Sequence, residues 1–240
     1  MKLKFIEFTG EKMAKRLSKV QWRRRKQRRK IIKNLLSIIF VAALIIIPLY
    51  AMFKLFMDNQ YGLITREETL GEPMSNGEVI KLDYLTPNPY SRPQDKLKRI
   101  KGVVIHYTAN PGTTAKNNRD YFEGLAKSHK TSASSHFIVG LEGEIIQCIP
   151  LTEISYASND RNVDTVAIEG CHPDKTGKYN EKTYSSLVAL TASLCKKFNL
   201  EEEDILRHYD VKGKPCPLYF VEDEAAWAQF KADVMAELDK

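Results

Sequence analysis

The sequence predicts an α/β fold in which a mixed central β-sheet is flanked by helices, preceded by one transmembrane helix. Between residues 98 and 240, short apolar runs rich in β-branched residues alternate with longer segments of helical periodicity. That alternation is typical of a sheet with helices packed on its faces. Upstream, residues 35–53 contain no charged side chain, and this run predicts the transmembrane helix.

The uncharged run also predicts an orientation. As a helix it is about 28 Å long, enough to cross a bilayer core. Residues 1–33 carry fourteen Lys and Arg against two Glu, and such a basic excess marks the cytoplasmic flank. We therefore expect a cytoplasmic tail at 1–33, a transmembrane helix at 34–57 and an extracellular remainder. A signal peptide would have a shorter apolar stretch and a cleavage site, and a buried core helix would have a polar face.

The net charge of +7 reflects the tail alone, because the rest of the chain carries 23 basic and 28 acidic residues. The basic run at 21–30 can indicate nucleic-acid binding or a juxtamembrane segment lying on anionic lipid. Because the run is next to the predicted membrane helix, we favour the lipid interpretation and expect no nucleic-acid partner.

Residues 58–97 have the composition of an extracellular spacer. Prolines interrupt the segment at Pro73, Pro87, Pro89 and Pro93. One short element, Glu78–Leu82, fits either a strand or a docking segment. A segment of this kind holds a domain away from the bilayer or wraps around it.

The remaining residues, 98–240, are expected to form the folded domain. Thr113 or Thr114 can cap its first helix, and Glu142–Gly143 is typical of a hairpin turn. The expected elements, in chain order, are a strand at 99–106, a helix to about residue 127, hairpin strands at 134–139 and 144–149, a buried strand at 162–169, and helices at 183–199 and 225–238.

Two histidines and one cysteine form a candidate metal site. His208 and Cys216 lie eight residues apart, and Gly213 with its neighbouring prolines supplies the turn that lets this loop double back. His106 ends an apolar strand far upstream. Two imidazoles and one thiolate leave a fourth position open, which is typical of catalytic rather than structural zinc. Spacing alone does not select these ligands, since either histidine alone is more commonly a hydrogen-bonded structural residue.

The other histidines and cysteines have simpler interpretations. His129 lies in a polar loop, and His172 is an alternative ligand by residue type. Cys195 lies near the apolar face of a predicted helix and is expected in the core. Cys148 and Cys171 can pair outside the cell if their strands are adjacent.

From about residue 99 to 220 the chain resembles the type 2 N-acetylmuramoyl-L-alanine amidases, a zinc family that includes the peptidoglycan recognition proteins. The resemblance is carried by four motifs in order: VVIHYT at 103–108, SSHFIV at 134–139, TVAIEGCHPD at 165–174 and RHYDVKGKPCP at 207–217. It implies a mixed central sheet flanked by helices, with a groove over one zinc ion.

The resemblance also assigns roles to individual residues. It implies that His106, His208 and Cys216 bind zinc, that Glu169 is the catalytic acid and base, and that Lys214 is the groove lysine. The chemistry agrees, because a carboxylate can move the proton of an attacking water and an ammonium can stabilise an oxyanion. The alternatives are an ion pair at the sheet edge for Glu169 and plain solvation for Lys214.

The sequence departs from the family at two positions. Ser135 stands where some relatives have a catalytic tyrosine, directly before His136, which is expected to form a wall of the site. Tyr156 stands in place of a substrate-contacting histidine in a Trp-His-Ala-Gly stretch. We expect Ser135, His136 and Tyr156 to contact substrate, and we expect specificity rather than metal binding to differ.

The resulting hypothesis is a membrane-anchored, outward-facing zinc amidase. It would hydrolyse the amide between N-acetylmuramic acid and L-alanine in peptidoglycan. One alternative is a peptidoglycan-binding module without turnover, against which the intact ligand set argues. Another is a membrane scaffold whose basic tail recruits cytoplasmic partners.

Overall fold

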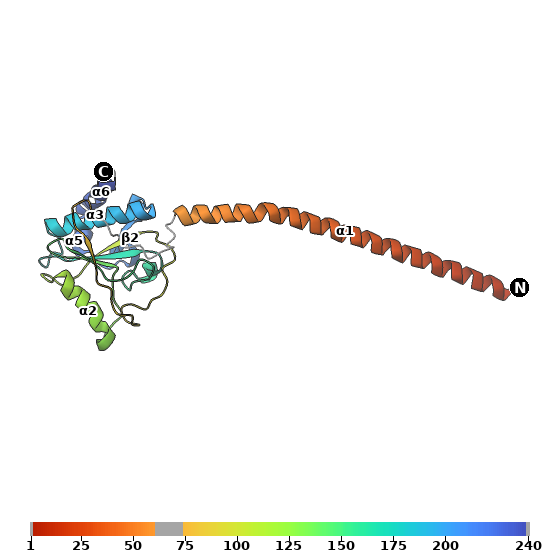
Figure 1. Ribbon diagram of the computed structural model, residues 1–240, viewed down its shortest axis with the longest axis horizontal. Helices are drawn as coiled ribbons and strands as arrows, with labels where there is room; N and C mark the ends of the chain where they lie inside the picture. Colours follow the sequence, from red (N-terminus) through yellow and green to blue (C-terminus); the bar gives the residue numbers. More distant parts are fainter. Residues whose placement is uncertain (1, 61–73, 239–240) are drawn as a thin grey trace. The chain divides into compact units, whose positions relative to one another are not determined.

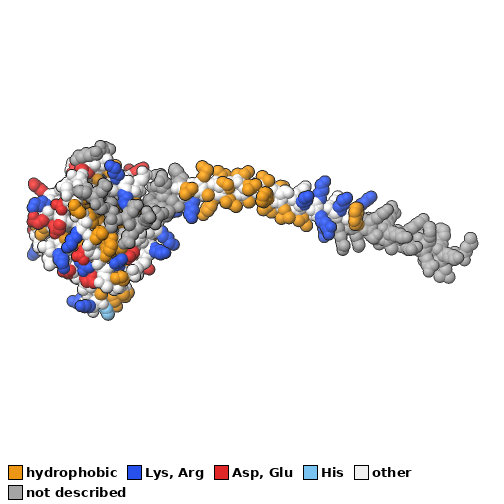
Figure 2. Space-filling model, in the orientation of Figure 1, with side chains coloured by type: hydrophobic (Ala, Val, Ile, Leu, Met, Phe, Trp, Pro, Cys, Tyr) orange, Lys and Arg blue, Asp and Glu red, His pale blue; other side chains and the backbone are white. Residues whose placement is uncertain are grey.

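The computed structural model describes residues 2–60 and 74–238, which form two units. The N-terminal unit is one long helix, α1 (Lys2–Gln60). Within it, Trp22–Leu55 contains an 18-residue apolar stretch with a mean hydropathy of 2.7, long and apolar enough to cross a membrane. None of that stretch is buried, so it is not a core helix of the described structure. Basic side chains precede the apolar stretch along the helix (Figure 2).

The second unit is built on a six-stranded mixed sheet with the order β1-β4-β3-β5-β2-β6. Its strands are β1 (Ile80–Leu82), β2 (Val103–Tyr107), β3 (Phe137–Val139), β4 (Ile145–Gln147), β5 (Val166–Gly170) and β6 (Ile205–Arg207). Only the β3–β4 pair is antiparallel. This arrangement confirms the predicted α/β fold with a mixed sheet.

Helices cover both faces of the sheet (Figure 1). Helices α3 (Glu181–Phe198) and α6 (Glu224–Leu238) pack on one face and α2 (Ala115–Ser128) on the other. Alternate strand residues point to opposite faces. Ile168 therefore joins the larger core under α3, while Ile138 joins the smaller core under α2.

Local sequence signals set the ends of the longer elements. Thr114 caps α2 in a reciprocal capping box with Asn117, and Asn180 caps α3 through the main-chain N–H of Thr183. Gly143 in the hairpin has φ +90°, a left-handed conformation that favours glycine. The predicted helices and the predicted hairpin are thus confirmed, with ends shifted by one or two residues at the helices.

Short elements next to the site were not predicted. They are the 3₁₀ helices η1 (Asn159–Val163) and η2 (Glu202–Asp204), strand β6, and the one-turn helices α4 (His208–Lys212) and α5 (Leu218–Glu222). The strand predicted at 162–169 begins only at Val166, because the preceding residues belong to η1. Segments of three to five residues are too short to show a period.

Part of the predicted spacer belongs to the folded unit. β1 pairs in parallel with β4, and Met74, Leu85 and Leu97 are buried. The fold therefore reaches back at least to residue 74 rather than starting at 98. The first three residues of the predicted spacer, 58–60, belong to α1. Residues 61–73 lie outside the described residues.

Candidate active site

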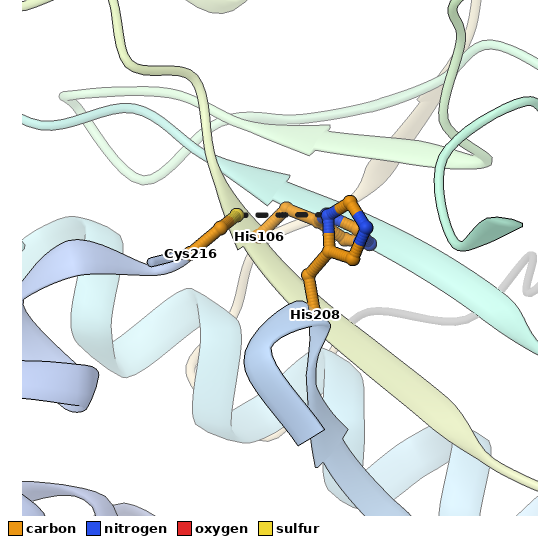
Figure 3. A group of neighbouring side chains, drawn as sticks. All are labelled: His106, His208 and Cys216. Atoms are coloured by element: carbon orange, nitrogen blue, oxygen red, sulfur yellow. Dashed lines mark hydrogen bonds between the residues drawn. The ribbon is translucent and has the colours of Figure 1, made fainter. Parts of the chain in front are cut away.

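The three predicted ligands converge although they come from distant parts of the chain. His106 lies near the carboxyl end of the central strand β2, and His208 begins α4 directly after β6. Gly213, at φ +71°, then reverses the chain, and the main-chain N–H of Tyr209 donates to the carbonyl of Cys216 at 3.0 Å. One ligand atom from each of the three side chains lies within 4.8 Å of the others (Figure 3).

The hydrogen bonds of the two imidazoles show which ring atoms face the centre. His106 Nε2 lies 3.1 Å from the Ser158 hydroxyl, and His208 Nε2 lies 2.7 Å from Oδ1 of Asn159. His106 Nδ1 lies 3.7 Å from the Cys216 sulfur. His208 Nδ1 is buried and has no hydrogen-bond partner among the described residues. Two Nδ1 atoms and one sulfur thus form a donor set that suits zinc.

Burial favours the neutral form of all three groups. It lowers the pKa of His106, and His208 and Lys214 lower it further. Burial and then Lys214 lower the pKa of His208. Burial raises the pKa of the Cys216 thiol to about 12, with Glu169 acting in the same direction. Neutral imidazoles are ready to bind a cation, whereas the thiol must release its proton on binding.

A cavity of about 600 Å³ opens over this group. All three ligands line it, together with Glu169 and Lys214. Burial raises the pKa of Glu169 to about 8, and the ammonium of Lys214 opposes that shift. One carboxyl oxygen of Glu169 is buried without a hydrogen-bond partner in the described part of the chain. The cavity therefore joins a metal-binding donor set to one acid and one cation.

The predicted substrate-binding residues separate into two groups. Tyr156 lines the cavity. Ser135 and His136 do not, because both are fully buried within the fold. The Ser135 hydroxyl donates to the carbonyl of Phe137 at 2.8 Å, and the two ring nitrogens of His136 are hydrogen-bonded inside the domain. The structure thus contradicts a substrate contact by Ser135 or His136 and makes both of them structural residues.

Other cavity residues were not identified from the sequence. Tyr121 of α2 is 54% exposed and lines one wall, and Asn159 and Asn162 line another. Tyr121 lies in the helix predicted to end near residue 127, and no sequence signal marks it as a site residue. The two asparagines lay in a segment predicted as strand or loop, and neither has a sequence signal that marks a site.

The remaining cysteines take no part in the site. Cys148 and Cys171 are buried and not bonded to each other, and Cys195 lies in the larger core, as expected. His172 is buried with Nδ1 2.6 Å from the carbonyl of Asp174, and it does not join the ligand group.

Comparison with known proteins identifies a family. Residues 96–218 match the family described as N-acetylmuramoyl-L-alanine amidase. The amidase CwlL of Bacillus licheniformis is 35% identical over 171 residues, which cover 65% of this chain and 46% of CwlL. The amidase BlyA of Bacillus subtilis (strain 168) is 34% identical over 181 residues, which cover 67% of this chain and 48% of BlyA. The chain thus spans about half the length of these relatives.

Solved structures share the fold. A mutant endolysin from Bacillus subtilis superimposes with a TM-score of 0.55 at 26% identity, covering 65% of this chain and 99% of the endolysin. The catalytic domain of PlyG gives a TM-score of 0.56 at 24% identity, and the match covers 66% of this chain and 94% of the PlyG domain.

Proposed function

The chain belongs to the N-acetylmuramoyl-L-alanine amidase family, whose pattern covers half of its length, and on that premise we propose that it is a zinc-dependent amidase of peptidoglycan. The bond it hydrolyses is the amide between the lactyl group of N-acetylmuramic acid and L-alanine. The observation that carries the proposal is the convergence of His106, His208 and Cys216 in a cavity that also holds Glu169 and Lys214.

The three ligands would hold the zinc ion through two imidazole nitrogens and one sulfur. A bound zinc ion polarises a carbonyl oxygen and makes hydroxide available near neutral pH. The donor set leaves a position for water or substrate, because only three protein groups converge among the described residues.

Glu169 is the proposed general base and acid. Its carboxylate takes a proton from the attacking water and returns that proton to the nitrogen of the leaving L-alanine. Burial raises the pKa of this carboxyl to about 8, and Lys214 lowers it. A cation bound between the ligands would lower it further, which favours the ionised base near neutral pH.

Lys214 is the proposed electrostatic stabiliser. Its ammonium lies close enough to influence the pKa values of Glu169 and both histidine ligands. An ammonium at the cavity can stabilise the negative charge that develops on the attacked carbonyl oxygen. Tyr156 provides a wall of the cavity for the substrate.

We also propose that α1 anchors the enzyme in the cell membrane. The basic residues of 1–33 would lie in the cytoplasm, 34–57 would span the bilayer, and the amidase domain would face the wall. The support is the exposed apolar stretch of α1 and the charge bias that precedes it.

Digestion of purified peptidoglycan tests the proposed reaction. The full-length protein in detergent should release peptides that begin with L-alanine, together with glycan strands carrying free lactyl carboxylates. Chelation should stop the release and added zinc should restore it. A Glu169→Ala variant should keep its zinc and lose turnover. Binding of peptidoglycan without zinc-dependent cleavage would instead favour a recognition module.

A further inference from the structure

Two neighbouring residues in one loop each contact one of the proposed zinc-ligating histidines. Ser158 Oγ lies 3.1 Å from His106 Nε2, and Asn159 Oδ1 lies 2.7 Å from His208 Nε2. The amide oxygen of Asn159 only accepts, so His208 must carry its proton on Nε2. The lone pair of His208 is therefore on Nδ1, the buried atom that has no partner in the described part of the chain.

The loop that carries these two residues is itself held in place. Oδ1 of Asn162 accepts the main-chain N–H groups of Ala157 at 3.1 Å and of Ser158 at 2.6 Å. Asn159 has φ +51°, a left-handed conformation that asparagine tolerates better than most residues. Asn159 is the first residue of the 3₁₀ helix η1, and Ser158 is its N-cap. One fixed segment thus sets the position of both hydrogen-bond partners of the histidines.

We propose that Ser158 and Asn159 are positioning residues that orient the two histidine ligands so that both present Nδ1 to the metal. This inference rests on the zinc site of the proposed function. A hydrogen bond to the outer nitrogen of a ligating histidine fixes its tautomer and ring angle and increases its basicity. Losing such a partner costs about 10- to 100-fold in metal affinity.

Asn159 also lines the cavity, so a direct contact with substrate is a competing role for it. Ser158 distinguishes the two roles, because it is fully buried and is not among the described cavity-lining residues. If both residues act through the histidines, removing either hydrogen-bond partner weakens zinc binding in the absence of any substrate.

Zinc competition on the full-length protein in detergent tests the proposal. The variants are Ser158→Ala, Asn159→Gly and Asn159→Asp. Glycine keeps the left-handed backbone but lacks the acceptor, whereas aspartate keeps an acceptor oxygen. Asp160→Gly is the matched control, because Asp160 follows Asn159 in η1 and its carboxylate is 3.8 Å from the exposed Lys212 rather than beside either histidine. Circular dichroism checks that each variant is folded.

We expect Ser158→Ala and Asn159→Gly to lose zinc to a chelator at about 10- to 100-fold lower chelator concentration than the parent. Asn159→Asp and Asp160→Gly should retain it. The d–d absorption bands of bound Co²⁺ should shift in the first two variants only. Unchanged zinc affinity in Ser158→Ala and Asn159→Gly, or a change in KM alone, would overturn the proposal. A parent protein that binds no zinc would instead contradict the proposed function.

Discussion

His106 and Glu169 occupy paired positions on the adjacent parallel strands β2 and β5. Paired residues project from the same face of a sheet, and neighbouring strands lie about 5 Å apart. The strand register therefore places the Glu169 carboxyl beside a proposed zinc ligand, and no loop is needed to deliver it. The sheet therefore fixes the relative positions of these two residues.

The first prediction concerns Glu169. Replacing it with glutamine keeps the volume of the side chain but removes the base. We expect kcat on peptidoglycan to fall by about 10²- to 10⁴-fold, with one zinc ion per chain retained. The control is Glu142→Gln, which changes an exposed hairpin residue that pairs with Lys182. Unchanged kcat in Glu169→Gln would remove this carboxyl from the mechanism.

The second prediction concerns Lys214. A Lys214→Met variant keeps the aliphatic stem and loses the charge, and we expect kcat to fall by about 10²-fold with little change in KM. Lys212→Met is the matched control, because Lys212 is exposed two residues away and is not among the residues that line the cavity. Equal effects of the two substitutions on kcat would argue against a specific role for Lys214.

Local patterns marked the three proposed ligands as candidates, although spacing alone did not select them and the family resemblance did. His106 ends an apolar strand, and Gly213 marks the reversal that returns Cys216 toward His208. The capping signal at Thr114 and the turn at Glu142–Gly143 likewise identified elements whose determinants are local. These features depend on a few neighbouring residues, so they can be seen in a single sequence.

What the sequence did not reveal depends on contacts between distant residues. Ser158 and Asn159 are ordinary polar loop residues until the fold brings them to His106 and His208, some fifty residues away in each case. His136 was expected to line the site, but β3 directs it into the interior. A polar residue before a strand carries no local signal for such burial.

The third prediction follows from that burial. His136 Nδ1 accepts the main-chain N–H of Ala167 at 3.1 Å, and its Nε2 lies 2.9 Å from the carbonyl of Glu153. Protonating Nδ1 would put its proton against that N–H group. Burial lowers the pKa of His136 from 6.5 to about 4, so the unfolded chain binds this proton more readily.

Stability should therefore fall as the pH falls from about 6.5 to about 4. Between these values the unfolded state holds more protons, which makes the free energy of unfolding increase with pH. The His136 contribution to the loss is about 3 kcal/mol over the window. Denaturant unfolding of the parent and of His136→Gln at several pH values measures it. The variant should show the shallower dependence, and parallel curves would contradict the assignment.

The fourth prediction concerns the proposed anchor. The full-length protein should sediment with membranes and resist extraction at alkaline pH, because its apolar stretch would lie in the hydrocarbon core. A chain that begins at residue 58 should be released to the soluble fraction with its amidase activity intact. Recovery of the natural protein without its N-terminal segment would indicate a cleaved signal sequence instead.

The most direct test of the central claim is X-ray absorption at the zinc edge of the purified protein. The ligand set of His106, His208 and Cys216 predicts two nitrogen neighbours at about 2.0 Å, one sulfur at about 2.3 Å and one further light atom from water. Cys216→Ser should abolish the sulfur signal. A site without sulfur in the parent protein, or with four protein ligands and no open position, would contradict the account.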